Sequence, residues 1–382
     1  MRSHRNVLTL SILVLVFVLL GLVLIQPKAN VYEWVFVYYM SYDNDLNPFG
    51  KVILGDLAKG IIDSKVAVVV QADFTDSRGM KRIALRHLNG KPHRKEINLK
   101  SEDSADVNEL RKYLEWVRKK WDAKNYCIVF LNHGGKLDQM CLDERPFRND
   151  SENKQFASGK WLSAAETGKI VADFNRKVDG KVRLLFLQQC GRAAIQNLYN
   201  FVDTAKYILA SPFRVDAPNT YYTKTLASVG RDPNVTGEIL AKTVMREDEH
   251  YTVYTLISNK ELKKLPEKLR PVLKSFGQKS NLNRPDSCPC VFEFEGDKFY
   301  DLMHYLQALN SANNDMADRE LSSFLNWYQN SLIVSRAVKG IGSSYSGLSI
   351  YVPSSKNDSI RYSFLPLYQQ TDLEEIMKLP SQ

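Results

Sequence analysis

The stretch VRLLFLQQCGR, residues 182–192, decides how the rest of the chain is interpreted. It opens with an apolar run and ends in two glutamines, a cysteine and a glycine. Apolar runs without polar alternation are typical of strands that are buried on both faces of a sheet. The segment YCIVFLNHGG at 126–135 has the same form, with an apolar run followed by polar residues and glycines. Both segments therefore predict buried strands that end in polar turns.

The neighbouring segments complete an alternation of strands and helices. Two earlier runs, EWVFVYYMSYDNDLN at 33–47 and KVAVVVQADFTD at 65–76, also predict buried strands followed by carboxylates. From Val107 to Trp121 apolar residues recur every three or four positions, which predicts an amphipathic helix, and a second helix is expected at 162–175. This alternation predicts an α/β fold with a mostly parallel central sheet and helices on both faces.

The composition allows a large core and does not favour a nucleic-acid partner. The chain has 382 residues, of which 44% are apolar and 25% are charged, and its formal net charge is +9. The densest basic run, RHLNGKPHRK at 86–95, contains an Asn-Gly pair that is typical of a β-hairpin turn. Because no basic run is interleaved with aromatic residues, we expect no nucleic-acid binding and interpret the hairpin as a solvated face.

The N-terminal segment VLTLSILVLVFVLLGLVLI, residues 7–25, has 19 residues and no charge. A signal peptide typically has ~7–15 apolar residues, whereas a membrane-spanning helix needs ~20. The following residues, QPKANVYEW, contain no clear small-x-small cleavage site. We therefore favour a transmembrane signal anchor over a cleaved signal peptide. Residues 1–6 would then be cytoplasmic and the rest of the chain extracytoplasmic.

His133 and Cys190 follow consecutive predicted strands and lie 57 residues apart. Parallel strands joined by a right-handed crossover end at the same edge of a sheet, and adjacent strands lie ~4.8 Å apart. An imidazole beside a thiol can take its proton and generate the nucleophilic thiolate. The glycines after His133 permit a sharp turn that exposes backbone N–H groups to a substrate carbonyl. The pair therefore predicts an acyl-transfer site.

The other four cysteines form no recognisable metal motif. Cys127 lies inside an apolar run and is interpreted as a core residue. Cys288 and Cys290 flank a proline, but no second cysteine pair or nearby histidine completes a zinc site, so we interpret them as part of a loop. Together with Cys141, these cysteines could form disulfides in an oxidising compartment. No metal ligand is predicted.

These motifs resemble those of the clostripain family of cysteine peptidases, which is related to the caspases. The resemblance implies a caspase-like three-layer sandwich, with a catalytic core at 31–235. It also implies a C-terminal extension at 236–382 that packs on the core and completes the sheet. Besides the segments quoted above, the similar stretches are AKYILASPFRVDAP at 205–218, YTLISNKELKKLPEKLRPVLKSF at 254–276 and YSGLSIYVP at 345–353.

The resemblance also implies roles for individual residues. Cys190 corresponds to the nucleophile and His133 to the general base and then acid, and the backbone N–H groups of Gly134 and Cys190 would form the oxyanion hole. The related peptidases usually work as a dyad, so no third member is expected. The implied reaction is peptide-bond hydrolysis through a thioester. The resemblance implies no required cofactor, and calcium enters by family analogy alone. Asp43, Asn44 and Asp45 supply oxygen ligands but lack the spacing of a calcium loop, so no calcium site is mapped.

The predicted substrate pocket departs from the family pattern. Gln188 stands where relatives typically have an aspartate that selects Arg or Lys, and a carboxamide cannot neutralise such a charge. Ser211 matches a pocket serine of the family, although a turn residue before Pro212 is an equal alternative. Gly135 and Gln196 replace a tryptophan and a glutamate that are frequent in the family. The residue preferred before the scissile bond is therefore left open.

Three functions are compatible with these residues. We favour a monomeric, exported and membrane-anchored cysteine endopeptidase that acts on peptide or protein substrates. The alternative is a pseudo-peptidase that binds peptides or partners, which the changes at Gln188 and Gly135 motivate. A basic surface-binding protein is the third, supported by the hairpin at 86–95 alone. Family members are often activated by self-cleavage in the connection that corresponds to 143–161, so self-processing there is a further hypothesis.

Overall fold

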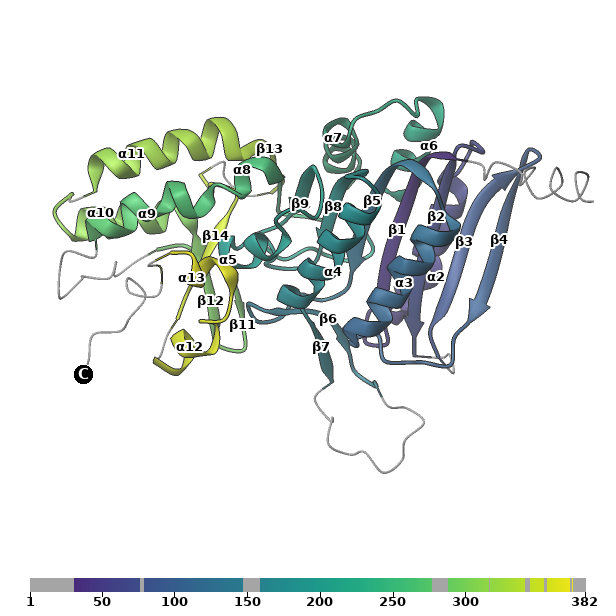
Figure 1. The fold of residues 1–382 in the computed structure, drawn as a ribbon, viewed down its shortest axis with the longest axis horizontal. Coiled ribbons are helices and arrows are strands. Elements are labelled where there is room, and N and C mark those ends of the chain that lie inside the picture. Colours follow the sequence, from purple (N-terminus) through teal and green to yellow (C-terminus); the bar gives the residue numbers. More distant parts are fainter. Residues whose placement is uncertain are drawn as a thin grey trace, which may run out of the picture. The chain divides into compact units, whose positions relative to one another are not determined.

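The computed structural model of the chain describes residues 31–75, 79–146, 159–276, 288–315, 317–340, 344–353, 356–371 and 373. A nine-stranded sheet forms its centre (Figure 1). The five central strands run parallel to one another, and two antiparallel strands extend the sheet at each edge. The spatial order is β13 (Ile333–Val338), β10 (Val253–Ser258), β9 (Tyr207–Ala210), β8 (Val182–Gln188), β5 (Ala123–Leu131), β1 (Tyr32–Tyr42), β2 (Val66–Phe74), β3 (Lys81–Leu88) and β4 (Lys91–Asn98).

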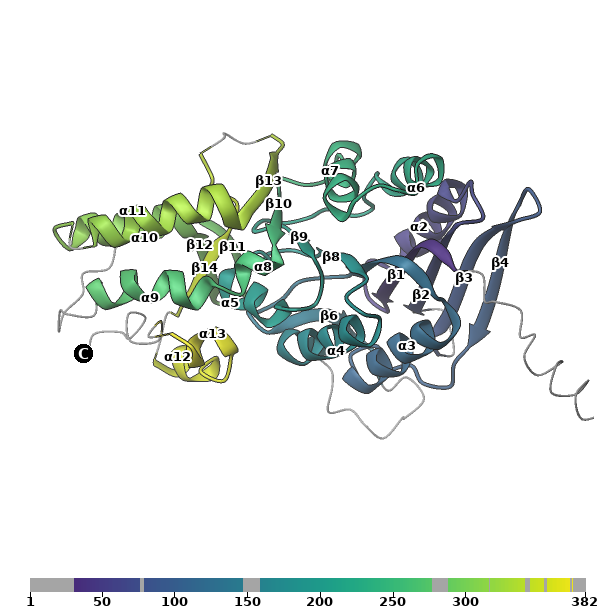
Figure 2. The same ribbon diagram turned by 45° about the horizontal axis from the view of Figure 1, so that its top comes forward.

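Helices cover both faces of this sheet (Figure 2). Each face has its own cluster of buried apolar side chains, because the central strands are apolar at successive positions. The predicted three-layer α/β architecture is therefore confirmed. One face is covered by α2 (Asn47–Gly60), α6 (Tyr222–Arg231) and α7 (Gly237–Glu247), and the other by α3 (Val107–Lys120) and α4 (Ala164–Lys177).

The two helices expected from the sequence form with side-chain caps. The Asp106 carboxylate accepts a hydrogen bond from the Asn108 N–H at the start of α3, and Ser163 accepts one from Glu166 N–H at the start of α4. Such caps satisfy N–H groups that have no partner inside the helix. The predicted basic hairpin also forms, since Asn89 and Gly90 turn between β3 and β4 with φ of 51° and 75°.

The C-terminal part adds two strands to the large sheet and forms a sheet of its own. The stretch YSGLSIYVP contains a strand, β14 (Ser349–Val352), which pairs with β12 (Asp297–Asp301) in a three-stranded sheet. The Ser349 N–H donates to the carbonyl of Ala193, so this sheet lies against the segment that follows Cys190. The small sheet is β11 (Cys290–Phe294), β12 (Asp297–Asp301) and β14 (Ser349–Val352), and a third, two-stranded sheet is β6 (Gln139–Asp143) and β7 (Lys160–Ser163).

The remaining helices all come after β8 along the chain. Two of them, α5 (Ile195–Leu198) and the 3-10 helix η2 (Tyr199–Phe201), come after Cys190. The others are α8 (Asn259–Leu262), α9 (Leu265–Phe276), α10 (Leu302–Ala312), α11 (Asp318–Trp327), the π-helix η3 (Tyr328–Leu332), α12 (Lys356–Arg361) and α13 (Pro366–Gln369).

The prediction of a transmembrane signal anchor is corrected here. Within the ranges that the structure describes, no helix is long and apolar enough to cross a membrane. The helices α2, α3 and α4 have 14 residues each, about 21 Å at 1.5 Å per residue, against a hydrocarbon core of about 30 Å. The segment named in that prediction, 7–25, lies outside the described residues.

Candidate active site

The sheet brings the two predicted catalytic residues to one edge. Strands β5 and β8 are parallel neighbours, and Leu131 at the end of β5 is paired with Gln188 at the end of β8. His133 and Cys190 each follow two residues later. Both residues therefore leave the sheet at the same carboxyl-terminal edge, from adjacent strands.

The turns that carry these residues are in direct contact. A Cβ atom at Gly134 would lie 2.1 Å from the Cys190 carbonyl oxygen, so only glycine permits this approach. The buried Gln189 side chain donates through Nε2 to the His133 carbonyl oxygen at 2.9 Å. The histidine turn and the cysteine turn thus form one packed unit.

Arg192 holds this unit together, a role that the sequence did not indicate. Its side chain is 0% exposed, and Nε donates to the Cys190 carbonyl at 3.0 Å. The rest of the guanidinium donates to carbonyls of the turn after His133, at 2.7 Å for Gly135, 3.1 Å for Lys136 and 2.7 Å for Gln139. Burial lowers the pKa of Arg192 to about 10. The guanidinium therefore cross-links the two turns through backbone carbonyls.

The Cys190 thiol is half-buried and contacts the turn after β9. The Val215 N–H donates to Sγ at 3.4 Å, and Sγ lies 3.8 Å from the Val215 carbonyl oxygen. Burial raises the pKa of the Cys190 thiol above its ordinary value. The hydrogen bond from Val215 and the charges of Arg192 and Arg214 act in the opposite direction. In this arrangement the thiol needs a base to become a nucleophile.

The His133 imidazole is hydrogen-bonded to a carboxylate that the sequence analysis did not assign to the site. Its Nε2 lies 2.6 Å from Oδ1 of Asp45, in the turn after β1. In the part of the chain that the structure describes, no hydrogen bond joins the imidazole to the Cys190 thiol. Catalytic hydrogen bonds often tighten only when substrate binds, so this geometry does not exclude the pair.

The two backbone donors predicted for an oxyanion hole are not used elsewhere. Among the described residues, the N–H groups of Gly134 and Cys190 donate to no acceptor. The N–H groups of the next residues do form hydrogen bonds: the Gly135 N–H donates to the Gln139 carbonyl, and the Gly191 N–H donates to the Phe213 carbonyl. Two free N–H groups from adjacent turns are the kind of donor that stabilises a tetrahedral oxyanion.

The Gln188 side chain forms hydrogen bonds inside the protein. The side chain is buried, with 5% exposure; Oε1 accepts from the Tyr221 hydroxyl at 2.7 Å and Nε2 donates to the Tyr222 hydroxyl at 2.8 Å. Nε2 also donates to Asn219, which in turn donates to Asp248 at 2.8 Å. No hydrogen bond links the Gln188 side chain to Cys190 within the described ranges. Its carboxamide is thus satisfied by a buried polar network.

Ser211 has the contacts of a turn residue. It is fully buried, and its hydroxyl accepts from the Phe213 N–H at 3.0 Å. Its carbonyl accepts from the Ala193 N–H at 3.0 Å, which fixes the turn after β9 against the cysteine turn. These contacts correspond to the alternative in which Ser211 shapes the turn before Pro212.

A small cavity adjoins the cysteine turn. Its volume is about 350 Å³, and two of its lining residues, Phe213 and Phe292, contact Gly191. Gly191 has φ of +66°, and a Cβ there would lie 2.2 Å from the Phe292 ring, so both conformation and space require glycine. The cavity is also lined by Arg214, Thr252, Cys290, Val291 and Glu293.

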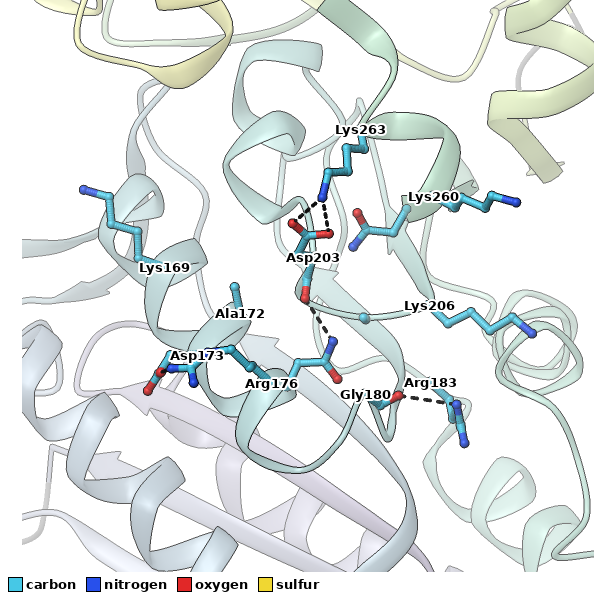
Figure 3. Close-up of a pocket in the computed structure, with 13 residues that line it drawn as sticks. Lys169, Ala172, Asp173, Arg176, Gly180, Arg183, Asp203, Lys206, Lys260 and Lys263 are labelled. Carbon is cyan, nitrogen blue, oxygen red and sulfur yellow. Dashed lines mark hydrogen bonds and ion pairs between the residues drawn. The ribbon is translucent and has the colours of Figure 1, made fainter.

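A larger cavity lies near the amino-terminal ends of β8 and β9, and Figure 3 shows the residues that line it. Its volume is about 970 Å³, and its lining includes Arg183 near the start of β8 and Lys206 just before β9. Some of its cations are neutralised, because Arg176 pairs with Asp173, and Lys263 pairs with Asp203 at 2.9 Å. The amino-terminal ends of β8 and β9 are remote from Cys190 along these strands, so this cavity is separate from the dyad.

One group of carboxylates is close enough to share a metal ion among the described residues. Oxygens of Asp43, Asp73 and Asp143, all buried, lie within 4.8 Å of one another. Both Asp143 oxygens already accept hydrogen bonds, from Ser104 at 2.8 Å and from the Arg145 N–H at 2.9 Å. Calcium takes six to eight oxygen ligands, so this group alone does not fit it and we assign no calcium site.

The raised pKa of the buried Asp143 carboxyl predicts a pH-dependent contribution to stability. Burial raises the pKa of its carboxyl to about 6, so its contribution to stability is full below the unfolded pKa of about 4 and is lost as the pH rises through about 6. We expect the unfolding free energy of Asp143→Asn, relative to the parent, to rise by about 2 kcal/mol between pH 4 and pH 8. Urea titrations at both pH values measure this. The control is Asp122→Asn, which replaces a half-exposed aspartate. If the difference in unfolding free energy between Asp143→Asn and the parent were the same at both pH values, the raised pKa of Asp143 would be contradicted.

The cysteines separate into distinct environments. All five are free, and Cys127 and Cys141 are buried. Burial raises the pKa of Cys141 to about 12 and that of Cys288 to about 11, and it raises the pKa of Cys127 as well. The prediction that Cys127 is a core residue is confirmed. Cys190 alone among the five follows a central strand at the histidine edge of the sheet.

A thiol and an imidazole at the carboxyl edge of a mostly parallel sheet, with helices on both faces, define the architecture of the caspase-like cysteine peptidases. Within this class, the model of the Clostripain family (Peptidase_C11) matches residues 38–375. The chain belongs to this family, as its sequence motifs predicted. No curated protein matches the sequence.

Solved structures share the fold. An inactive zymogen C11 protease from Parabacteroides distasonis has a TM-score of 0.70 and 15% identity, covering 90% of this chain and 99% of that chain. A secreted C11 cysteine protease from Bacteroides thetaiotaomicron, in complex with an irreversible peptide inhibitor, has a TM-score of 0.66 and 16% identity, with the same coverage of both chains. At these identities the likeness shows the fold, and the predicted caspase-like architecture is confirmed.

Proposed function

We propose that the protein is a clostripain-type cysteine endopeptidase with Cys190 as nucleophile and His133 as general base and acid. The observation that carries this proposal is the exit of both residues from adjacent parallel strands, with their turns in backbone contact. Membership of the family supports a hydrolase. The intact pair favours an enzyme over a pseudo-peptidase.

The reaction follows from these groups. His133 takes the thiol proton, and the thiolate forms a bond to the carbonyl carbon of the scissile peptide. The N–H groups of Gly134 and Cys190 would stabilise the resulting oxyanion. The imidazolium then protonates the leaving amine, the C–N bond breaks, and a thioester forms. Water, deprotonated by His133, hydrolyses the thioester and restores the thiol. No step requires a cofactor.

Proton transfer requires the thiol and the imidazole to come into hydrogen-bond contact. In the described structure Sγ accepts from the Val215 N–H, and the imidazole is hydrogen-bonded to Asp45. The cavity beside Gly191, lined by Phe213, Arg214 and Glu293, would accept a substrate side chain. Gln188 does not line this cavity, since its side chain is held by Tyr221, Tyr222 and Asn219.

We infer an extracytoplasmic location and a peptide or protein substrate. The location is supported by the secreted relative from Bacteroides thetaiotaomicron, and the substrate by the peptide inhibitor in that structure. We expect a monomer. Self-processing in 143–161 stays a hypothesis, since residues 147–158 lie outside the described residues.

The proposal is tested with a peptide library that places every residue type before the scissile bond. The purified parent, Cys190→Ala and His133→Ala are compared, with their melting temperatures as the control for folding. We expect cleavage by the parent alone, and the preferred residue reports what the substrate pocket selects. Equal cleavage by Cys190→Ala would show a contaminating or different activity. No cleavage by the parent, with an unreactive Cys190 thiol, would support the pseudo-peptidase.

A further inference from the structure

We propose that Asp45 is a positioning residue that orients the His133 imidazole, which makes the expected dyad a three-residue arrangement. The inference rests on the proposed peptidase function. Its basis is the hydrogen bond of 2.6 Å between Asp45 Oδ1 and His133 Nε2. The two residues are 88 positions apart in the chain, so the fold alone brings them together.

The turn that presents Asp45 is anchored by buried asparagines. Asn44, 3% exposed, donates through Nδ2 to the Asn132 side-chain oxygen at 3.1 Å and to the Leu142 carbonyl at 2.8 Å. Its Oδ1 accepts from the Leu46 N–H at 3.0 Å, on the far side of Asp45. Asn132 directly precedes His133 and also donates to the Leu142 carbonyl, at 2.8 Å. The residues flanking Asp45 and His133 are therefore tied to each other.

This contact selects one form of the imidazole. When Nε2–H donates to the carboxylate, the neutral ring has its lone pair on Nδ1, which can accept the proton of a thiol. After that transfer, the carboxylate also stabilises the imidazolium charge. Asp45 touches neither the thiol nor the site of the scissile bond in this scheme, so it acts through His133. Its side chain is 75% exposed, and we therefore expect a moderate effect.

The test combines a spectroscopic signature with kinetics on the full chain. Nitrogen NMR of ¹⁵N-histidine-labelled protein assigns the His133 tautomer, with His133→Gln used to identify its signals among the six histidines. We expect the Nε2–H form in the parent and loss of that preference in Asp45→Ala. Asp45→Asn, which keeps an acceptor oxygen, should restore part of it. The kcat for the best library peptide should fall about tenfold in Asp45→Ala, with KM within about twofold.

The matched control is Asp56→Asn, which removes another surface aspartate that pairs with Lys59 on α2 at 3.0 Å. It should change neither the tautomer nor kcat. An unchanged His133 tautomer in Asp45→Ala overturns the proposal whatever the kinetics. An unchanged kcat also overturns it, and an increased kcat would identify the contact as inhibitory instead. If the parent cleaves no peptide, the proposed function fails, while the NMR result still decides whether Asp45 orients His133.

Discussion

Replacing His133 with alanine is expected to lower kcat/KM for peptide hydrolysis by about 10²–10⁴-fold, the usual contribution of a positioned general acid–base group. Two observations predict this loss. Burial raises the pKa of the Cys190 thiol, so the thiolate does not form readily without a base. Among the histidines that the structure describes, His133 is the one that follows the strand next to that of Cys190. Initial-rate kinetics with the best library peptide measure the effect.

His304→Ala is the matched control for this loss. His304 is also paired with an aspartate, Asp301, at 3.2 Å, and its side chain is 35% exposed against 31% for His133. It lies on α10, far along the chain from the predicted dyad. We expect its kcat/KM to stay within about threefold of the parent. A loss as large as that of His133→Ala, at an unchanged melting temperature, would refute a specific role for His133.

Replacing Arg192 with methionine is expected to destabilise the protein by about 3–5 kcal/mol. The guanidinium is completely buried and donates to the carbonyls of Cys190, Gly135, Lys136 and Gln139, which methionine would leave without these donors. Urea denaturation measures the change. Because the same bonds join the histidine and cysteine turns, peptide cleavage should also fall under conditions where the variant is folded.

Arg118→Met is the control for this variant. Arg118 lies at the surface on α3 and pairs with Glu115 at 2.7 Å, an interaction whose removal should cost no more than about 1 kcal/mol. If Arg192→Met were no less stable than Arg118→Met, the cross-link between the two turns would not contribute as described.

The parts of the fold that were predicted correctly depend on local patterns. The strands β1, β2, β5 and β8 are apolar at nearly every position, and the 3-4 spacing of α3 is visible without any tertiary contact. The exit of His133 and Cys190 at one edge followed from the parallel topology. The hairpin was predictable because Asn-Gly has few other uses between two strands.

The parts that were missed depend on partners that are distant in the chain. The four-residue strand β14 does not specify by its own sequence which sheet it joins, and it pairs with β12 in the small one. An arginine is rarely buried, so nothing in the sequence indicated that Arg192 would bind backbone carbonyls. Asp45 was considered only as a calcium ligand. Its proximity to His133 depends on the packing of Asn44 on Asn132, a tertiary contact that the sequence does not show. The transmembrane prediction used the length and apolar character of 7–25 and the missing cleavage site. That segment lies outside the described residues, and no described helix is long and apolar enough to cross a membrane.

The central claim, that Cys190 is a nucleophile activated by His133, is tested most directly by covalent capture. The parent and His133→Ala are treated with an irreversible thiol-reactive peptide probe, and the modified cysteine is located by mass spectrometry after digestion. We expect an adduct on Cys190 in the parent, formed much faster than on Cys290, the exposed cysteine, and strongly slowed in His133→Ala. Labelling of Cys190 no faster than Cys290, or independent of His133, would contradict the account.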